Sequence, residues 1–411
     1  MDSRTAALVT AAALSLVFSP PRSAALLRGT KPVPVDVRDR VQLLLDDYFV
    51  AEKSGLTLEV APARADHARL IAPDGAGDRY GVWPWSTVIE DGGRLRMWYS
   101  AYSDPAGEIG RMCYAESTDG VRWAKPNCGV PDNGGSANDN IVLTMGHPGS
   151  VFLDPSAPIE SRFKCIFGHR DKGSEYGHRM TIHDGDKVFD WLGPTVEGAV
   201  SPDGLHWKKI GRLMDWYTDT GNVGFYDPNL RRYVCYLRDN QYPRFEGGAI
   251  RCVARTESGT FGAFPRPARV LAPDKSDPPG TDLYNPAAHV YPFADSVYLM
   301  FPSAFYHDTD NLEIQIATSR DGIRWARAER TPFVKPGPDG SFDSRQVYMG
   351  VGMVERGDEI WMYYGGFSVG HGEAKRGPGM GGVGRAVFLR DRLIAQVAGR
   401  AGGRLRTRPV R

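Results

Sequence analysis

Short runs of alternating hydrophobic and polar residues recur along this chain, and each run ends in a tight turn. The clearest run, ATSRDGIRWARA at Ala317–Ala328, predicts two strands joined by an Asp-Gly turn, with a tryptophan in the second strand. Asp-Gly between β-prone runs is a strong hairpin signal, because glycine adopts the positive φ that a twist-matched turn requires. The pattern recurs at Ala115–Lys125 and Ala199–Lys209, and in a degenerate form at Ala254–Phe264. A hairpin repeated along one chain indicates a repeat architecture.

Each of these four hairpins closes a longer unit, in which an apolar strand ends near an acidic turn and an aromatic-rich strand follows. A fifth unit is predicted to end in a different hairpin at Val383–Val397. The units lie at approximately 80–130, 138–212, 218–270, 282–332 and 343–400. Five units of four antiparallel strands predict an all-β chain, folded as a single five-bladed β-propeller domain over residues 35–411. The segment Val35–Val60 would close the ring by pairing a strand with the other chain end. The repeated tryptophans are predicted to pack between blades.

The N-terminus has the layout of a secretory signal peptide over residues 1–25. A short polar piece containing Arg4 precedes the apolar run Thr5–Phe18, and small residues follow near Ser23–Ala25. This layout predicts a secreted or periplasmic protein with no membrane segment once the peptide is removed. An uncleaved membrane anchor is the alternative, because the two signals are similar.

Composition narrows the classes of partner. The hydrophobic content of 41% and the net charge of +1 fit a globular protein and give no field that would attract nucleic acid or an anionic membrane. The 48 glycines and 30 prolines suit many strands joined by turns. The five cysteines occupy mostly core-like strand positions, which predicts neither a disulfide framework nor a metal site. We expect no metal, no cofactor and a monomer.

Acidic residues precede the predicted innermost strands of several blades, where the connecting loops of a propeller crowd one mouth of the central channel. Four aspartates share this position: Asp139, Asp219, Asp282 and Asp343. If they converge, repulsion and burial would separate their pKa values, as glycoside hydrolysis requires of its two carboxyl groups. The preferred catalytic set is Asp219, Asp282 and Asp343, followed by Asp139 and Glu197. Each aspartate alone also fits a turn residue.

Carbohydrate sites also need planar aromatic walls and polar groups that bind hydroxyls. The candidate substrate-binding residues lie in the same loops or follow second strands: Trp85, Arg170, Arg238, Asn222, Asn285, Tyr284, His307 and Arg345. Glu197 and Glu246 are separate candidates for a general acid, and a solvated loop carboxylate is an equally good interpretation of each.

Several motifs together are similar to those of a known group of exported bacterial proteins. These motifs are LDDYFVA, TDTGN, FYDP, YVCYLRD, DLYN and SFDS, the last before WMYYGG, and they fall within Val41–Pro409. They resemble proteins identified as glycoside hydrolase family 32 N-terminal-like, within the five-bladed furanosidase group of families 32, 43 and 68. The resemblance implies a propeller that acts on a carbohydrate substrate.

The chain departs from the furanosidase pattern at two of its three acids. Ser86 stands in the first blade where the group has an aspartate, and Asp78 is the nearest acid. Neither Arg170-Asp171 nor Arg238-Asp239 is followed by the proline of the group's second motif. We therefore predict a secreted glycoside hydrolase-like protein. A carbohydrate-binding propeller without catalysis is the first alternative, and a protein-interaction scaffold is the second.

Overall fold

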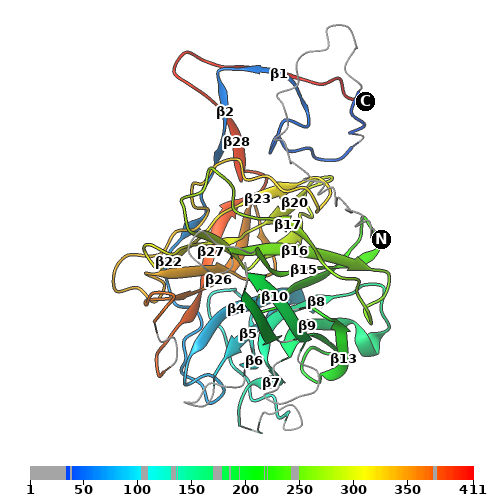
Figure 1. The fold of residues 1–411 in the computed structure, drawn as a ribbon, viewed down its shortest axis with the longest axis vertical. Helices are drawn as coiled ribbons and strands as arrows, with labels where there is room; N and C mark the ends of the chain where they lie inside the picture. Colours follow the sequence, from blue (N-terminus) through cyan, green and yellow to red (C-terminus); the bar gives the residue numbers. More distant parts are fainter. Residues whose placement is uncertain are drawn as a thin grey trace, which may run out of the picture.

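In the computed structural model, the regular elements of the described residues are almost all β-strands (Figure 1). The described residues are 34–37, 39–102, 110–130, 136, 138–169, 178–184, 187–193, 195–216, 218–219, 221–241, 250–373 and 377–411. Within these ranges helix is limited to the 3-10 turn Ile159–Ser161, and no helix is long and apolar enough to cross a membrane. The predicted signal peptide at residues 1–25 lies outside the described residues.

Three antiparallel sheets have the four strands expected of a propeller blade. The first consists of β4 (Val82–Asp91), β5 (Arg94–Ala101), β6 (Gly110–Ser117) and β7 (Ile141–Met145). The second consists of β8 (His147–Leu153), β9 (Phe163–His169), β12 (Thr195–Ser201) and β13 (Lys208–Met214). The third consists of β14 (Val223–Asp227), β15 (Arg232–Gln241), β16 (Ile250–Ser258) and β17 (Ala268–Leu271). Two further strands, β10 (His178–Asp184) and β11 (Lys187–Gly193), pair with each other.

The remaining strands correct the predicted number of blades. An eight-stranded sheet contains β18 (Thr281–Tyr284), β21 (Ser303–Tyr306), β22 (Asn311–Ile314), β24 (Gln346–Met349), β25 (Val354–Arg356), β26 (Glu359–Phe367), β27 (Gly382–Leu389) and β3 (Arg64–Ala65). A three-stranded sheet contains β19 (Ala288–Val290), β20 (Tyr298–Met300) and β23 (Ala317–Ser319). A parallel pair between Leu312 and Gln346 joins the fourth and fifth predicted units into one sheet. The described residues therefore form a propeller with four blades, and the predicted count of five was wrong.

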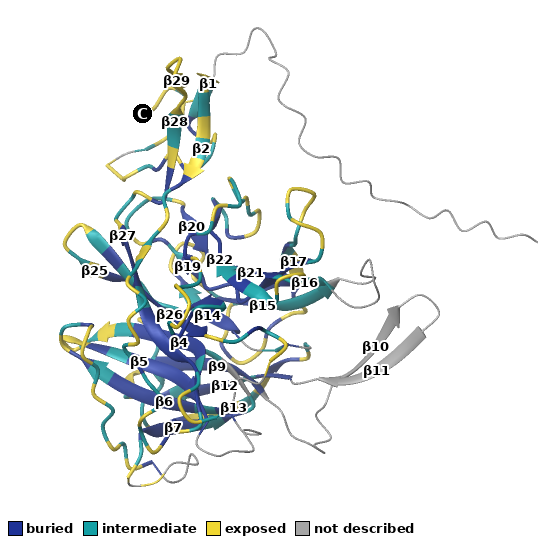
Figure 2. Cartoon of the chain, turned by 90° about the vertical axis from the view of Figure 1, so that its left-hand side faces the viewer, coloured by how far each residue is buried: buried dark blue, intermediate teal, exposed yellow. Residues whose placement is uncertain are grey.

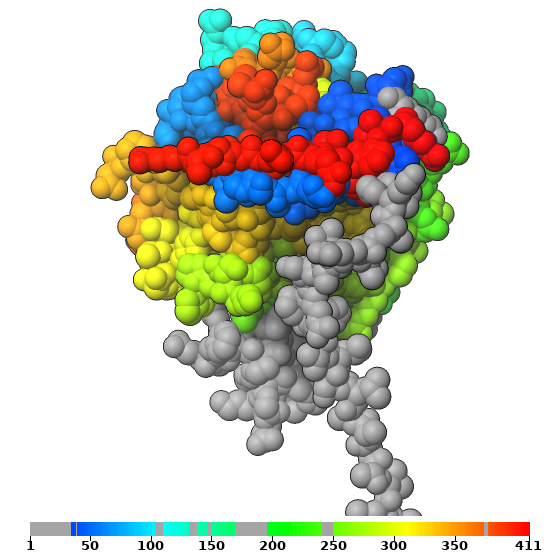
Figure 3. Space-filling model, turned by 90° about the horizontal axis from the view of Figure 1, so that it is seen from above, coloured from blue at the N-terminus to red at the C-terminus, as the bar shows by residue number. Residues whose placement is uncertain are grey.

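The two chain ends pair with each other, but the strands of the segment Val35–Val60 do not join a blade sheet, where this segment was predicted to close the ring. Strands β1 (Val50–Ser54) and β2 (Leu56–Val60) pair with β29 (Arg404–Thr407) and β28 (Ile394–Ala398). These two ribbons project from the blades, and the C-terminal residues lie beside N-terminal ones (Figures 2 and 3). The strand that joins a blade sheet is β3, which lies just beyond the predicted segment and pairs with β27.

The repeated Ser-x-Asp-Gly sequence forms the same turn at each complete copy. In the second copy, the Ser201 hydroxyl oxygen accepts from the Gly204 amide at 2.9 Å, and Asp203 Oδ1 accepts from the Leu205 and His206 amides at 2.9 Å each. Gly204 has φ 76°, which favours glycine. The tryptophan then donates from its indole nitrogen to the Gly204 carbonyl oxygen at 2.9 Å. The hairpin that the sequence predicts is thus fixed by side chains within the repeat.

Each turn also binds the neighbouring sheet through its glycine carbonyl oxygen. Trp98 of the first sheet donates to Gly204 of the second at 2.6 Å, and Tyr236 of the third sheet donates to Gly322 at 2.5 Å. Tyr363 of β26 donates to Gly120 at 2.9 Å. Trp207 is 6% exposed and packs in the same core cluster as Trp98. The repeated tryptophans were predicted to pack between blades, and this is confirmed, because Trp123 likewise contacts Tyr363 and Trp325 contacts Tyr236.

We expect Asp203→Ala to lower the free energy of unfolding by about 1 kcal/mol at pH 7, because two amides of the turn lose their acceptor. Partial burial raises the pKa of Asp203, but hydrogen bonds from His206 and Leu205 outweigh it and lower the pKa to about 2. In the unfolded chain the pKa of an aspartate is near 4. The lower pKa of Asp203 in the folded protein therefore stabilises the fold at pH values above about 4, and this contribution is lost as the pH falls through about 2.

Urea unfolding of Asp203→Ala beside the wild type, between pH 7 and pH 2, measures this contribution. The difference between the free energies of unfolding of the two proteins should become smaller below about pH 4. Asp358→Ala is the control, because Asp358 is 93% exposed and its ion pair with Arg390 is expected to contribute little. A difference in the free energy of unfolding that stays constant across this pH range would contradict the stabilising role of the ionised Asp203 carboxylate.

Candidate functional site

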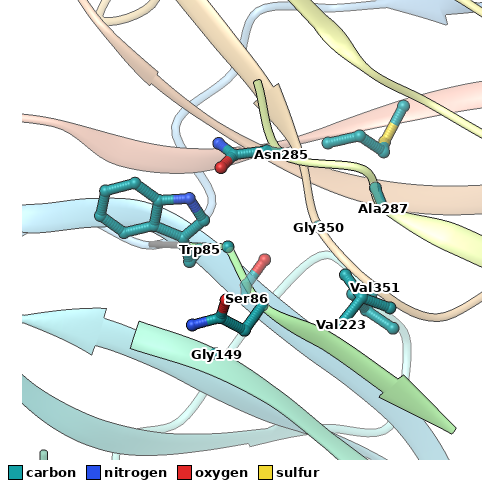
Figure 4. Close-up of a pocket in the computed structure, with 11 residues that line it drawn as sticks. Trp85, Ser86, Gly149, Val223, Asn285, Ala287, Gly350 and Val351 are labelled. Carbon is teal, nitrogen blue, oxygen red and sulfur yellow. The ribbon is translucent and has the colours of Figure 1, made fainter. Parts of the chain in front are cut away.

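The innermost strands surround a narrow cavity at the centre of the propeller (Figure 4). It is lined by residues of four sheets and their connecting loops: Trp85, Ser86, Gly149, Gly221, Asn222, Val223, Asn285, Ala287, Met349, Gly350 and Val351. About 10 Å³ is open to the centre of a water molecule, which is room for about one water. Three predicted substrate-binding residues, Trp85, Asn222 and Asn285, are thus brought together here.

A second group of side chains, which we call the mouth cluster, gathers around the ring of Tyr284. The Arg238 and Arg251 guanidinium groups lie over this ring, 5.3 and 4.6 Å from its centroid. His371 Nε2 lies 3.0 Å from the Tyr284 hydroxyl oxygen, and Asp219 forms an ion pair with Arg238. Because Tyr284 precedes Asn285 in the chain, the mouth cluster adjoins the central cavity.

Asp282 also belongs to the mouth cluster, but its carboxylate is fully buried. Its Oδ1 accepts from the Arg251 amide at 3.2 Å, and its Oδ2 lies 2.5 Å from Arg251 Nη1 and 2.9 Å from His307 Nε2. The carboxylate therefore holds the Arg251 guanidinium and the His307 imidazole in place. The catalytic role predicted for Asp282 stays a prediction, and the contacts that the structure shows are these hydrogen bonds within the mouth cluster.

Asp219 differs from Asp282 in its exposure. Its side chain is 28% exposed, whereas the Asp282 side chain is 0% exposed. The Asn222 amide nitrogen donates to the Asp219 carbonyl oxygen at 2.8 Å, which ties the loop of Asp219 to the residues of the central cavity. An ion pair with a guanidinium favours the ionised carboxylate. Asp219 is thus a partly exposed carboxylate whose backbone carbonyl is bonded to Asn222, a residue that lines the cavity.

Aromatic side chains form a wall next to the cavity. The rings of Trp83 and Trp85 lie 4.9 Å apart, and Trp83 makes an edge contact with Phe367 at 6.0 Å. Trp85 also approaches Tyr348, with ring centroids 6.1 Å apart. Trp85, Tyr348 and Phe367 are buried, whereas Trp83 is of intermediate exposure, so Trp83 is the member of this wall that is most open to solvent.

Asp343, a preferred catalytic candidate, lies in a separate buried network. Its carboxylate is 0% exposed and binds His67 Nδ1 at 2.8 Å, the Tyr364 hydroxyl at 2.7 Å and the Ser341 hydroxyl at 2.6 Å. Burial, followed by the charge of Asp343, raises the pKa of Tyr364 well above its usual value. With these three partners Asp343 serves as an internal acceptor between β3, β24 and β26.

Asp139 does not belong to the channel mouth, which corrects the prediction. Its sequence position predicted an innermost strand after it, but that strand is β7, at the outer edge of the first sheet. The Asp139 carboxylate accepts from the Ser136 amide at 2.9 Å and from the Ile141 amide at 3.0 Å, which is a turn role. The innermost strand of the second sheet is β8, which begins at His147.

The other candidates lie in varied places. Glu197 is on β12, with β9 between it and the innermost strand β8, so it stands apart from the cavity. Arg345 precedes β24 and donates from Nη2 to the Thr309 carbonyl oxygen at 3.2 Å. Arg170 and Glu246 lie outside the described residues. Within the described ranges, no three His, Cys, Asp or Glu side chains are placed to hold a metal ion.

The structure adds Arg251 to the site, which the sequence did not single out. Arg251 is the second residue of β16 and reaches Tyr284 and Asp282 of the next sheet. No local motif marks it, because its role depends on the contact between two sheets. His371 follows β26 of the same sheet as Tyr284, and the contact between them joins parts of the chain that are far apart in sequence.

Comparison with known proteins gives distant similarity over most of the chain. The sequence matches no protein-family model. It is 19% identical over 344 residues to an A type blood N-acetyl-α-D-galactosamine deacetylase of Flavonifractor plautii, a match that covers 75% of this chain and 42% of that protein. The chain therefore spans less than half the length of this curated relative.

Solved structures share the fold at low sequence identity. One is β-1,2-mannobiose phosphorylase from Listeria innocua in complex with β-1,2-mannobiose, with a TM-score of 0.53, 12% identity, and 80% of this chain and 96% of that chain covered. Another comes from work on GH130 mannoside phosphorylases and glycoside hydrolases that target β-1,2 mannosidic linkages. It has a TM-score of 0.50 and 14% identity, and the match covers 87% of this chain and 99% of that chain. The structural neighbours are thus glycoside hydrolase-like propellers, and the finer resemblance to families 32, 43 and 68 stays a prediction.

Proposed function

We propose that this propeller cleaves glycosidic bonds of an oligo- or polysaccharide at the channel mouth, with Asp219 as the reacting carboxylate. One observation carries the proposal: Asp219 is 28% exposed beside the cavity, while Asp282 and Asp343 are fully buried among hydrogen-bond donors. A carboxylate must be reachable to attack an anomeric carbon or to activate water. The glycoside hydrolase-like fold of the solved neighbours supports the same class of reaction.

The pairing of Asp219 with Arg238 suits it to the role of base or nucleophile, because this pair stabilises the charged form. Proton transfer to the leaving oxygen requires a second group. His307 fits this role, because its side chain is 33% exposed and its Nε2 is held by the buried carboxylate of Asp282. Asp282 would then act as a positioning residue for both His307 and Arg251.

The groups that would bind the sugar come from the same elements. Trp83 and Trp85 offer ring faces, and Asn285 and Arg238 offer hydrogen-bonding groups near them. Sugar sites combine such apolar faces with a few placed polar groups. We further propose that residues 35–411 act as one exported, monomeric domain after removal of residues 1–25, as the N-terminal sequence predicts.

A panel of plant, algal and bacterial glycans tests this function. The purified protein is incubated with each glycan, with and without inorganic phosphate, and released sugars are identified by mass spectrometry. Phosphate is included because two guanidinium groups, those of Arg238 and Arg251, lie in the mouth cluster. Free sugars would establish hydrolysis, and sugar phosphates would establish phosphorolysis. No release, with retention on one immobilised glycan, would establish a carbohydrate-binding propeller and overturn the proposal.

A further inference from the structure

Four buried polar atoms without a hydrogen-bond partner line the central cavity. They are the indole nitrogen of Trp85, the hydroxyl oxygen of Ser86, and both amide atoms of Asn285. The three residues are 8%, 4% and 6% exposed, so solvent outside the protein does not satisfy these atoms. Buried polar groups in folded proteins nearly always have a partner, so four such atoms around one cavity point to a ligand atom or a bound water.

The backbone around the cavity is also in an uncommon conformation. Asn285 has φ 37° and Ala287 has φ 35°, both in the left-handed region. Ala287 is 1% exposed, and alanine adopts such angles rarely. Strained residues of this kind persist where the surrounding structure holds them, and they gather at ligand sites. The strain therefore fixes the Asn285 amide toward the cavity at a cost to the fold.

Gly221 keeps the space between Trp85 and Asn285 open. Its φ is 72°, and a Cβ at this position would collide with Asn285 Oδ1 and lie 3.1 Å from Trp85 Nε1. Figure 4 shows the Trp85 indole and the Asn285 amide bordering the same space. Because Gly221 lies two residues from Asp219, this space is next to the proposed reacting carboxylate.

The rest of the cavity limits what can enter. Val223, Ala287, Met349 and Val351 are apolar and line its remaining sides, and the space holds about one water-sized group. A charged group would be left without a counter-ion there, and a whole sugar ring does not fit. A neutral group of one or two heavy atoms, with both a donor and an acceptor, matches the cavity.

We propose that the cavity binds a single hydroxyl or hydroxymethyl group of the sugar at the channel mouth. Trp85 Nε1 donates to the hydroxyl oxygen, and the Asn285 amide accepts its hydrogen. This subsite selects sugars by the presence and orientation of that group, because an analogue without it leaves the buried atoms unpaired. The sugar as ligand class rests on the proposed function, whereas the selection rests on the cavity itself.

The experiment is a binding titration followed by tryptophan fluorescence. D-glucose, D-galactose, D-mannose and L-arabinose are titrated, each beside its 2-deoxy and 3-deoxy counterparts, and the hexoses also beside their 6-deoxy forms. We expect the wild type to bind one sugar about tenfold more tightly than one of its deoxy analogues. Trp85→Phe and Gly221→Ala should reduce that ratio to below about twofold, the first by removing the donor and the second by filling the space.

Trp123→Phe is the matched control. Trp123, in the first hairpin, also has a buried indole nitrogen without a hydrogen-bond partner. Its ring packs against Tyr363 of β26, and Trp123 does not line the cavity. This variant should keep the tenfold ratio. If Gly221→Ala does not fold because of its positive φ, Trp85→Phe alone decides the matter.

Two results would overturn the inference. One is a wild type that binds none of the sugars or prefers none over its deoxy forms. The other is an unchanged preference in Trp85→Phe, which would mean that the cavity holds an ordered water only. The proposed function fails separately, since selective binding can persist in a protein that cleaves no glycan.

Discussion

Replacing Asp219 with asparagine should lower the rate of glycosidic bond cleavage by at least about a hundredfold, the lower limit for a group that attacks or activates water. The substitution keeps the size of the side chain and removes its charge, so the partly exposed carboxylate that pairs with Arg238 is lost. Initial rates on the glycan that the wild type cleaves measure the effect. Arg238 would keep a hydrogen-bond acceptor in the amide, and we therefore expect thermal stability to fall by only a few degrees.

Asp215→Asn is the matched control for this prediction. Asp215 lies four residues before Asp219 and is also paired with an arginine, Arg212, but its side chain is 51% exposed. This variant should keep the wild-type rate. An Asp219→Asn protein that folds and cleaves within about threefold of the wild type would show that another group reacts with the substrate.

Replacing Asp282 with alanine should have the largest effect on stability. The substitution removes a fully buried acceptor and leaves the Arg251 guanidinium, with a side chain only 23% exposed, without this counter-charge. Breaking a buried ion pair on one side costs about 3–5 kcal/mol. We expect the free energy of unfolding in urea to fall by this amount, and cleavage to fall with it, because Arg251 and His307 lose their fixed positions.

The surface variant Asp215→Ala sets the scale for that measurement. Its ion pair is half exposed, and exposed pairs contribute less than about 1 kcal/mol. A loss below about 1 kcal/mol for Asp282→Ala would contradict the buried network described for the mouth cluster. Asp282→Asn keeps the volume of the side chain, and its loss in the free energy of unfolding should lie between those of Asp215→Ala and Asp282→Ala.

Local sequence signals predicted the parts of the fold that depend on local physics. Each complete Ser-x-Asp-Gly copy forms its turn through bonds within a few residues, as at Ser201 and Asp203, so the pattern alone identifies it. The all-β propeller fold was predicted correctly for the same reason, because its repeated hairpins are specified by residues close together in the sequence. The place of Asp219 before an innermost strand, β14, was also predicted, while its catalytic role stays a prediction.

Contacts between sheets were not predictable in the same way. The single parallel pair of Leu312 with Gln346 decides whether the fourth and fifth units form one sheet or two, and no motif marks it. Asp139 was misplaced because β7 is edge-like and is followed at once by β8, so an outer strand was interpreted as an inner one. Arg251 belongs to the site because its side chain, on β16, bonds to Asp282 of β18 in the neighbouring sheet.

The most direct test of the channel-mouth site is a crystal structure of Asp219→Asn with the oligosaccharide that the wild type cleaves. We predict a sugar ring against Trp83 and Trp85, with the scissile bond within about 3.5 Å of the residue 219 side chain. Ligand density elsewhere, such as the groove lined by Phe225, Tyr226 and Tyr291, with the channel mouth empty, would contradict the assignment of this site.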